Sequence, residues 1–105
     1  MDKKAVLDAL ARFREALAAE GVCAPRLILF GSHARGEARE HSDIDVAVVS
    51  DAFEGKSHWE RITLLSKAIC ASHVLIEAVA MTRDEWEHGG SLIAEFAREG
   101  EEIPA

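Results

Sequence analysis

Residues 31–48, GSHARGEAREHSDIDVAV, place two aspartates, Asp43 and Asp45, at the start of an apolar run. Alternate side chains of a strand share one face, so Asp43 and Asp45 point the same way, and Ile44, Val46 and Val48 point into the core. The rise of a strand sets the two aspartate Cα atoms about 6.6 Å apart. Two carboxylates held side by side are good ligands for hard cations such as Mg²⁺, although a bare pair also occurs as solvated residues at a strand end.

Apolar periodicity and capping residues predict the elements around this stretch. A helix follows Asp2 and carries Val6, Leu7, Leu10, Phe13 and Leu17 on one face. Residues 26–30 form a strand that is apolar on both faces, and residues 43–49 form a second strand.

The second half of the chain continues the alternation. Ser57 and Glu60 form a capping box for a helix whose apolar residues are Trp59, Ile62, Leu65 and Ile69. Residues 73–81 form a third strand, Thr82 and Glu85 open a short helix, and residues 91–99 form the last helix. The resulting order, α-β-β-α-β-α-α, indicates a layered α/β domain with a small sheet.

The third strand carries one charge, Glu77, in an otherwise apolar run. A buried carboxylate in mid-strand is costly unless something compensates it. A cation shared with Asp43 and Asp45 would do so, and the three acids would make a site for one or two metal ions. The alternative is an edge strand on which Glu77 faces water.

Gly31 and Ser32 directly follow the first apolar strand. The missing Cβ of Gly31 lets a phosphate approach the backbone, and the Ser32 hydroxyl can donate to a phosphate oxygen. Arg35 lies three residues on, on the same face of a helical turn that Gly36 ends. Taken alone, the pattern is also compatible with an ordinary turn.

Composition limits the function classes. The chain has 105 residues and a net charge of −7, which disfavours binding nucleic acid by neutralising phosphates. No run of about 18 apolar residues occurs, and no signal core follows the N-terminus, so we expect a cytoplasmic chain with no membrane span. Cys23 and Cys70 form no CxxC pair and are expected to be buried, reduced thiols. We expect residues 1–105 to form one domain.

The combination of these features resembles the signature of the nucleotidyltransferase superfamily typified by DNA polymerase β, and especially its minimal, single-domain members. Their usual form is Gly-Ser-x-Ala-Arg-Gly-x-Ala, a few residues, then Ser-Asp-Ile-Asp and an apolar run. This chain reads GSHARGEA at 31–38 and SDIDV at 42–46. The ending SLIAEFAREGEEI also looks like the family's final helix. The resemblance implies the α/β (α+β) nucleotidyltransferase fold, a small mixed β-sheet flanked by helices with some strands antiparallel.

The resemblance also implies roles for single residues. Gly31 and Ser32 would bind the triphosphate of an NTP, with Arg35 beside them. Asp43 and Asp45 would ligate two Mg²⁺ ions. Glu77 falls where the third carboxylate is expected, as a ligand of the ion that activates the attacking hydroxyl or as its general base. That position is more often Asp in the family, and Glu is one methylene longer.

Minimal members of the superfamily commonly act as antitoxins beside a small all-helical HEPN ribonuclease toxin, and they transfer AMP from ATP to a tyrosine of that toxin. The resemblance therefore implies a HEPN-family partner in a hetero-oligomer, with ATP as substrate and Mg²⁺ as cofactor. This chain contains no tyrosine, so it cannot be its own tyrosine substrate. Two alternatives are a non-catalytic module that masks a HEPN partner by contact, and a nucleotidyltransferase acting on a small molecule such as an aminoglycoside.

Overall fold

The computed structural model describes residues 2–37 and 43–104 of the chain. The elements follow in the order α1 (Lys3–Ala19), β1 (Arg26–Phe30), α2 (Ser32–Arg35), β2 (Ile44–Val49), the 3₁₀ helix η1 (Asp51–Phe53), α3 (His58–Ser72), β3 (Ile76–Met81), α4 (Arg83–His88), α5 (Leu92–Arg98) and β4 (Glu101–Ile103). The predicted mixture of a small sheet and flanking helices is confirmed. Two positions of the family motif, Ala38 and Ser42, lie outside the described residues.

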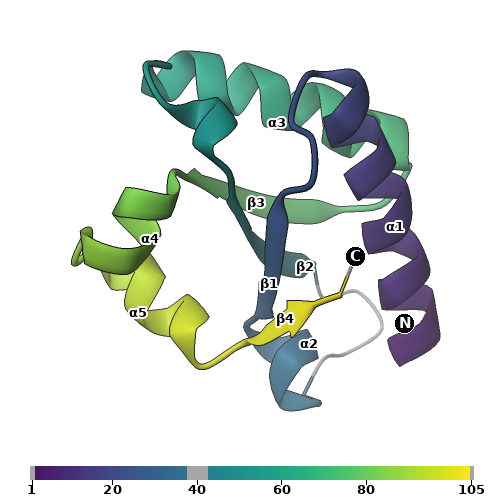
Figure 1. Ribbon diagram of the computed structural model, residues 1–105. Coiled ribbons are helices and arrows are strands. Elements are labelled where there is room, and N and C mark those ends of the chain that lie inside the picture. The colour runs from purple at the N-terminus through teal and green to yellow at the C-terminus, as the bar shows by residue number, and fades with distance from the viewer. Residues whose placement is uncertain (1, 38–42, 105) are drawn as a thin grey trace.

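Within these residues the four strands form one sheet in the order β3-β2-β1-β4 (Figure 1). Strand β1 runs antiparallel to both of its neighbours, β2 and β4, whereas β2 and β3 are parallel. The sheet is therefore mixed, as the resemblance implied. Strands β3 and β4 form its two edges.

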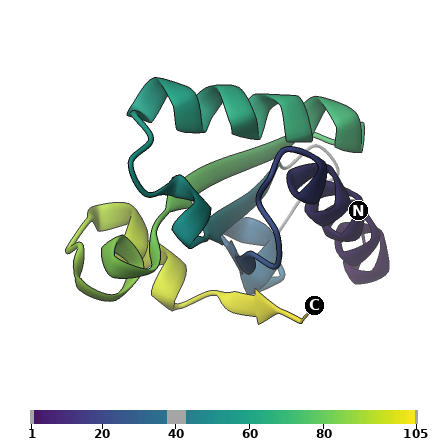
Figure 2. The same ribbon diagram turned by 45° about the horizontal axis from the view of Figure 1, so that its top comes forward.

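Helices cover both faces of the sheet, and Figure 2 shows α3 on one side and α4 with α5 on the other. Leu27 and Leu29 of β1 pack with α1 and α3, whereas Ile28 packs with α4 and α5. Strand β2 alternates in the same way: Ile44, Val46 and Val48 enter the first core, and Ala47 and Val49 enter the second. The side chain of Asp45 therefore lies on the α4–α5 face, because alternate residues share a face.

The predicted helix starts are confirmed by their caps. The Asp2 carboxylate accepts a hydrogen bond from the Ala5 N–H at 2.8 Å and opens α1. Ser57 with Glu60 opens α3 through a capping box, and Thr82 with Glu85 opens α4 in the same way. Each cap satisfies backbone donors that have no partner within the helix. In the part of the chain that the structure describes, no helix is both long and apolar enough to cross a membrane.

Three details of the sequence prediction are wrong. Strand β3 begins at Ile76 and not at residue 73, because His73 takes a left-handed conformation (φ 60°) that ends α3. Of the four apolar residues expected on α3, Leu65 is buried and Ile69 packs against the core, whereas Trp59 is 74% exposed and Ile62 is 36% exposed. The two cysteines are exposed and not buried.

The last strand, β4, was not predicted from the sequence, which indicated only a helix ending near Gly100. Helix α5 ends at Arg98, and β4 then pairs antiparallel with β1. Contacts from distant residues hold β4: Arg26 pairs with Glu102 at 2.7 Å, and Arg14 donates to the Ile103 carbonyl at 3.1 Å. A strand of three residues has no internal period that could reveal it, so only this pairing defines it.

Candidate active site

The predicted site residues meet at one end of the sheet. Strand β1 ends at Phe30, and β2 and β3 begin at the same end, because β1 is antiparallel to β2 and β2 is parallel to β3. In this register Asp45 lies beside Phe30 on one side and beside Glu77 on the other. Gly31 follows Phe30 directly. The topology thus brings together Gly31, Asp45 and Glu77, which are far apart in the sequence.

Gly31 lies directly against the carboxylate of Asp45. A Cβ atom placed on Gly31 would come within 2.3 Å of the Asp45 Oδ2 atom. Its backbone has φ 74° and ψ −153°, a conformation that residues with a side chain rarely adopt. Both the conformation and the close approach therefore require glycine at this position. Gly31 and Asp45, which belong to the same sequence motif, therefore contact each other in the folded chain.

A single turn of helix, α2, follows Gly31 and carries Ser32 at its start. Gly36 ends this turn in a left-handed conformation, as predicted. The Arg35 guanidinium forms an ion pair with Glu37, with 3.1 Å between Nε and Oε2, and its side chain is 60% exposed. Arg35 thus lies on the turn that follows Gly31, but its charge is shared with a neighbouring carboxylate.

The three carboxyl groups influence one another. A side-chain hydrogen bond with Asp45 and repulsion from Asp45 and Asp43 together raise the pKa of Glu77 above its ordinary value. Asp43 and Asp45 are half-buried, whereas Glu77 is exposed. Crowding of like charges raises the pKa of an acid because its charged form becomes less favourable. Glu77 therefore lies within electrostatic reach of both aspartates.

The position of Glu77 corrects part of the sequence argument. Strand β3 is an edge strand and Glu77 is exposed, so this residue is not a buried charge in need of compensation. Its proximity to Asp45 and Asp43 is what connects it with the site. Within residues 2–37 and 43–104, no three His, Cys, Asp or Glu side chains are arranged as a ready-made metal site. The donor set nevertheless fits Mg²⁺ in its chemistry, because carboxylate oxygens are hard ligands and a cation relieves their repulsion.

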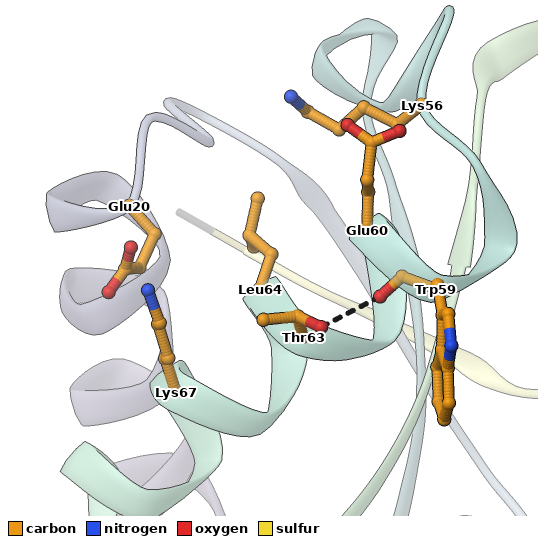
Figure 3. Close-up of a pocket in the computed structure, with 7 residues that line it drawn as sticks. All are labelled: Glu20, Lys56, Trp59, Glu60, Thr63, Leu64 and Lys67. Carbon is orange, nitrogen blue, oxygen red and sulfur yellow. Dashed lines mark hydrogen bonds between the residues drawn. The ribbon is translucent and has the colours of Figure 1, made fainter.

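Two larger hollows of the surface, of about 490 and 500 Å³, are lined by none of these three acids. Figure 3 shows a pocket of about 490 Å³ between α3 and the end of α1, lined by Glu20, Lys56, Trp59, Glu60, Thr63, Leu64 and Lys67. Within it, the Thr63 hydroxyl donates to the Trp59 carbonyl at 2.8 Å, a bond internal to the helix. No residue of the family motif lines this pocket. We therefore place the chemistry at the end of the sheet.

A smaller cavity, of about 110 Å³, borders Gly31. Its lining includes Phe30, Phe96 and Glu99, none of which the sequence analysis selected. Phe30 belongs to β1, but Phe96 and Glu99 come from the far end of the chain. No spacing in the sequence signals this meeting, because it depends on how α5 packs on the sheet.

Comparisons with known proteins agree with this geometry. The family model of the nucleotidyltransferase domain matches residues 10–93, which include every predicted site residue. The crystal structure of a protein from Sulfolobus solfataricus, provisionally described as a nucleotidyltransferase, superposes with a TM-score of 0.55 at 19% identity and covers 83% of this chain and 81% of that one. Such a likeness supports the fold. No curated protein matches the chain. The chain belongs to the nucleotidyltransferase domain family, and its general function is nucleotidyl transfer.

Proposed function

We propose that this chain transfers AMP from ATP to a hydroxyl group, a tyrosine, of a HEPN-family partner and so acts as the antitoxin of that protein. The observation that carries the proposal is the contact of Gly31 with Asp45, together with the pairing of Asp45 with Glu77 across β2 and β3. Family membership supplies the reaction class. The acceptor and the biological role are the proposed parts.

The reaction is a displacement at phosphorus. The acceptor oxygen attacks the α-phosphorus of ATP, the bond from this phosphorus to the oxygen shared with the β-phosphorus breaks, and pyrophosphate leaves. The hydroxyl proton passes to a carboxylate. Glu77 suits this role, or that of a ligand to the ion that activates the hydroxyl, because it is exposed and pairs with Asp45 across β2 and β3.

Gly31 and Ser32 hold the phosphates in this proposal. The backbone at Gly31 is open to an anion because it carries no side chain, and the Ser32 hydroxyl donates a hydrogen bond to a phosphate oxygen. Asp43 and Asp45, with Glu77, would hold two Mg²⁺ ions. Bound Mg²⁺ offsets the negative charge of the triphosphate and of the leaving pyrophosphate. Much of the remaining rate enhancement comes from positioning.

A protein acceptor is consistent with the composition and the exposed surface of this chain. The chain has no tyrosine, so a tyrosine acceptor must come from another protein. Large apolar side chains are exposed and offer contact area, such as Trp59 at 74% and Leu75 at 75%. The net charge of −7 favours a basic partner. We place the reaction in the cytoplasm, where ATP is supplied.

Intact-mass analysis tests the proposal. The chain is co-expressed with a HEPN partner, purified as a complex and incubated with ATP and Mg²⁺. The partner should gain the mass of one or more AMP groups, and the chain itself should gain none. Asp45→Asn is the matched control, because it removes one charge at similar volume and should abolish the mass gain.

Two other outcomes would contradict this function. A stable complex without any mass gain on the partner would favour the non-catalytic binding module. Transfer of AMP to an aminoglycoside, with no protein product, would favour a small-molecule enzyme. Light scattering on the co-expressed pair separates these cases from a simple failure of the two chains to associate.

A further inference from the structure

A cavity of about 110 Å³ lies between α2 and the end of α5, next to the candidate active site. Its lining consists of Phe30, Gly31, Ala34, Arg35, Phe96, Glu99 and Gly100. Gly31 belongs both to this cavity and to the turn that contacts Asp45. The cavity therefore borders the proposed phosphate site at Gly31. It is far smaller than the pockets that enclose whole ligands, so it admits one flat ring and not a whole nucleotide.

Phe30 brings an aromatic ring to the face of the sheet that carries the acids. It lies opposite Asp45 in the antiparallel register of β1 and β2, and residues opposite each other across such a pair have neighbouring side chains on one face. Phe30 is also half-buried and packs against the core formed under α4 and α5. Its ring is thus held in place beside Asp45.

Phe96 supplies the second aromatic ring, from α5. Its side chain is 61% exposed, whereas Ala94 and Ala97 of the same helix are fully buried. The end of α5 is held close to β1, because a Cβ atom placed on Gly100 would come within 2.2 Å of the Leu29 carbonyl oxygen. This close packing fixes where Phe96 and Glu99 stand beside the cavity. An exposed aromatic ring on a firmly packed helix end is available to a ligand.

We propose that this cavity is the subsite for the base of the NTP, with the base stacked against Phe96 and Phe30. This inference rests on the proposed nucleotide site at Gly31. Bases stack readily on aromatic side chains. Glu99 adds selectivity, because an ionised carboxylate only accepts hydrogen bonds and so favours a base with an amino group. ATP should therefore bind more tightly than UTP.

Calorimetry with three probes tests the subsite on the full chain in the presence of Mg²⁺. The probes are ATP, UTP and inorganic tripolyphosphate. The wild-type chain should bind ATP more tightly than tripolyphosphate. Phe96→Ala should raise the Kd for ATP about five-fold or more and leave the Kd for tripolyphosphate unchanged. Phe96→Leu keeps an apolar side chain without a ring and should behave like Phe96→Ala.

Leu92→Ala is the matched control, because Leu92 is 72% exposed on the same helix and does not line the cavity. It should leave the Kd of all three probes unchanged. Glu99→Gln should narrow the difference between ATP and UTP, because the amide can also donate to a base. Thermal melting checks that each variant is folded.

Different results overturn different parts of the argument. Equal Kd values for ATP and tripolyphosphate in the wild type, or an unchanged ATP Kd in Phe96→Ala, would remove the base subsite and leave the phosphate site standing. A wild-type chain that bound none of the probes would overturn the proposed function together with the subsite. Loss of AMP transfer in both Phe96→Ala and Leu92→Ala, with normal ATP binding, would assign α5 to partner docking instead.

Discussion

Replacing Gly31 by alanine tests the contact that joins the turn to the acidic site. The new Cβ atom would come within 2.3 Å of the Asp45 Oδ2 atom, which is far below van der Waals distance. The Asp45 carboxylate would have to rotate away, or the turn would have to move. Either change should abolish AMP transfer, because Asp45 is a proposed metal ligand.

The cost in stability has two parts. A residue with a side chain held at φ 74° and ψ −153° is strained by roughly 1–3 kcal/mol. Forcing the Asp45 side chain away from a favoured rotamer costs about 0.5–1.5 kcal/mol more. The free energy of unfolding should therefore fall by about 1.5–4.5 kcal/mol, which for a chain of this size lowers the melting temperature by at least about 6 °C.

Gly36→Ala is the matched control. Gly36 also has a positive φ, 71°, but a Cβ atom there would have nothing within 4 Å. Its cost should be only the strain of the left-handed conformation, about 1–2 kcal/mol. Urea unfolding followed by circular dichroism measures both variants, and the double variant Gly31→Ala/Asp45→Ala should recover the part of the loss that comes from the overlap.

Equal losses of stability in Gly31→Ala and Gly36→Ala would refute the reasoning, and so would a double variant that recovers nothing. Either result would mean that the Gly31 backbone and the Asp45 carboxylate are not in contact in the folded protein.

Three more changes test neighbouring features. Asp45→Asn should keep the fold and raise the melting temperature slightly. It should also return the pKa of Glu77 toward its ordinary value, since the largest causes of that shift involve Asp45. An NMR titration that gives the same pKa of Glu77 in the wild type and in Asp45→Asn would contradict this. Ser32→Ala should weaken catalysis by roughly 1–3 kcal/mol in kcat/KM, without loss of folding stability, if the hydroxyl bonds a charged phosphate oxygen. The Thr82 N–H bonded to Glu85 lowers the pKa of that carboxyl below its ordinary 4.5, so this contact stabilises the fold above pH 4.5 and is lost as the pH falls through the lowered pKa. Glu85→Gln keeps a capping side chain but does not titrate, so acid unfolding curves should depend less on pH; an unchanged dependence would count against the cap.

Local patterns in the sequence were sufficient for the elements and for part of the site. The caps at Asp2, Ser57 and Thr82 are confirmed because they depend only on residues within a few positions. The alternation in residues 44–49 placed Ile44 in the core and Asp45 on the opposite face, since a strand has a period of two. The motif resemblance added the mixed sheet, which the order of elements does not specify.

Features that depend on which segments pack together were decided only by the tertiary structure. The strand order puts β3 at an edge, so Glu77 is exposed and its link with Asp45 comes from register and not from burial. Strand β4 is stabilised by its pairing with β1 and by the hydrogen bond from Arg14 to the Ile103 carbonyl. The cavity beside Phe96 forms because the end of α5 packs against β1. These contacts join residues far apart in the chain; Arg14 and Ile103, for example, are 89 positions apart. Local propensity cannot encode them, since their free energy arises only when the two segments have met.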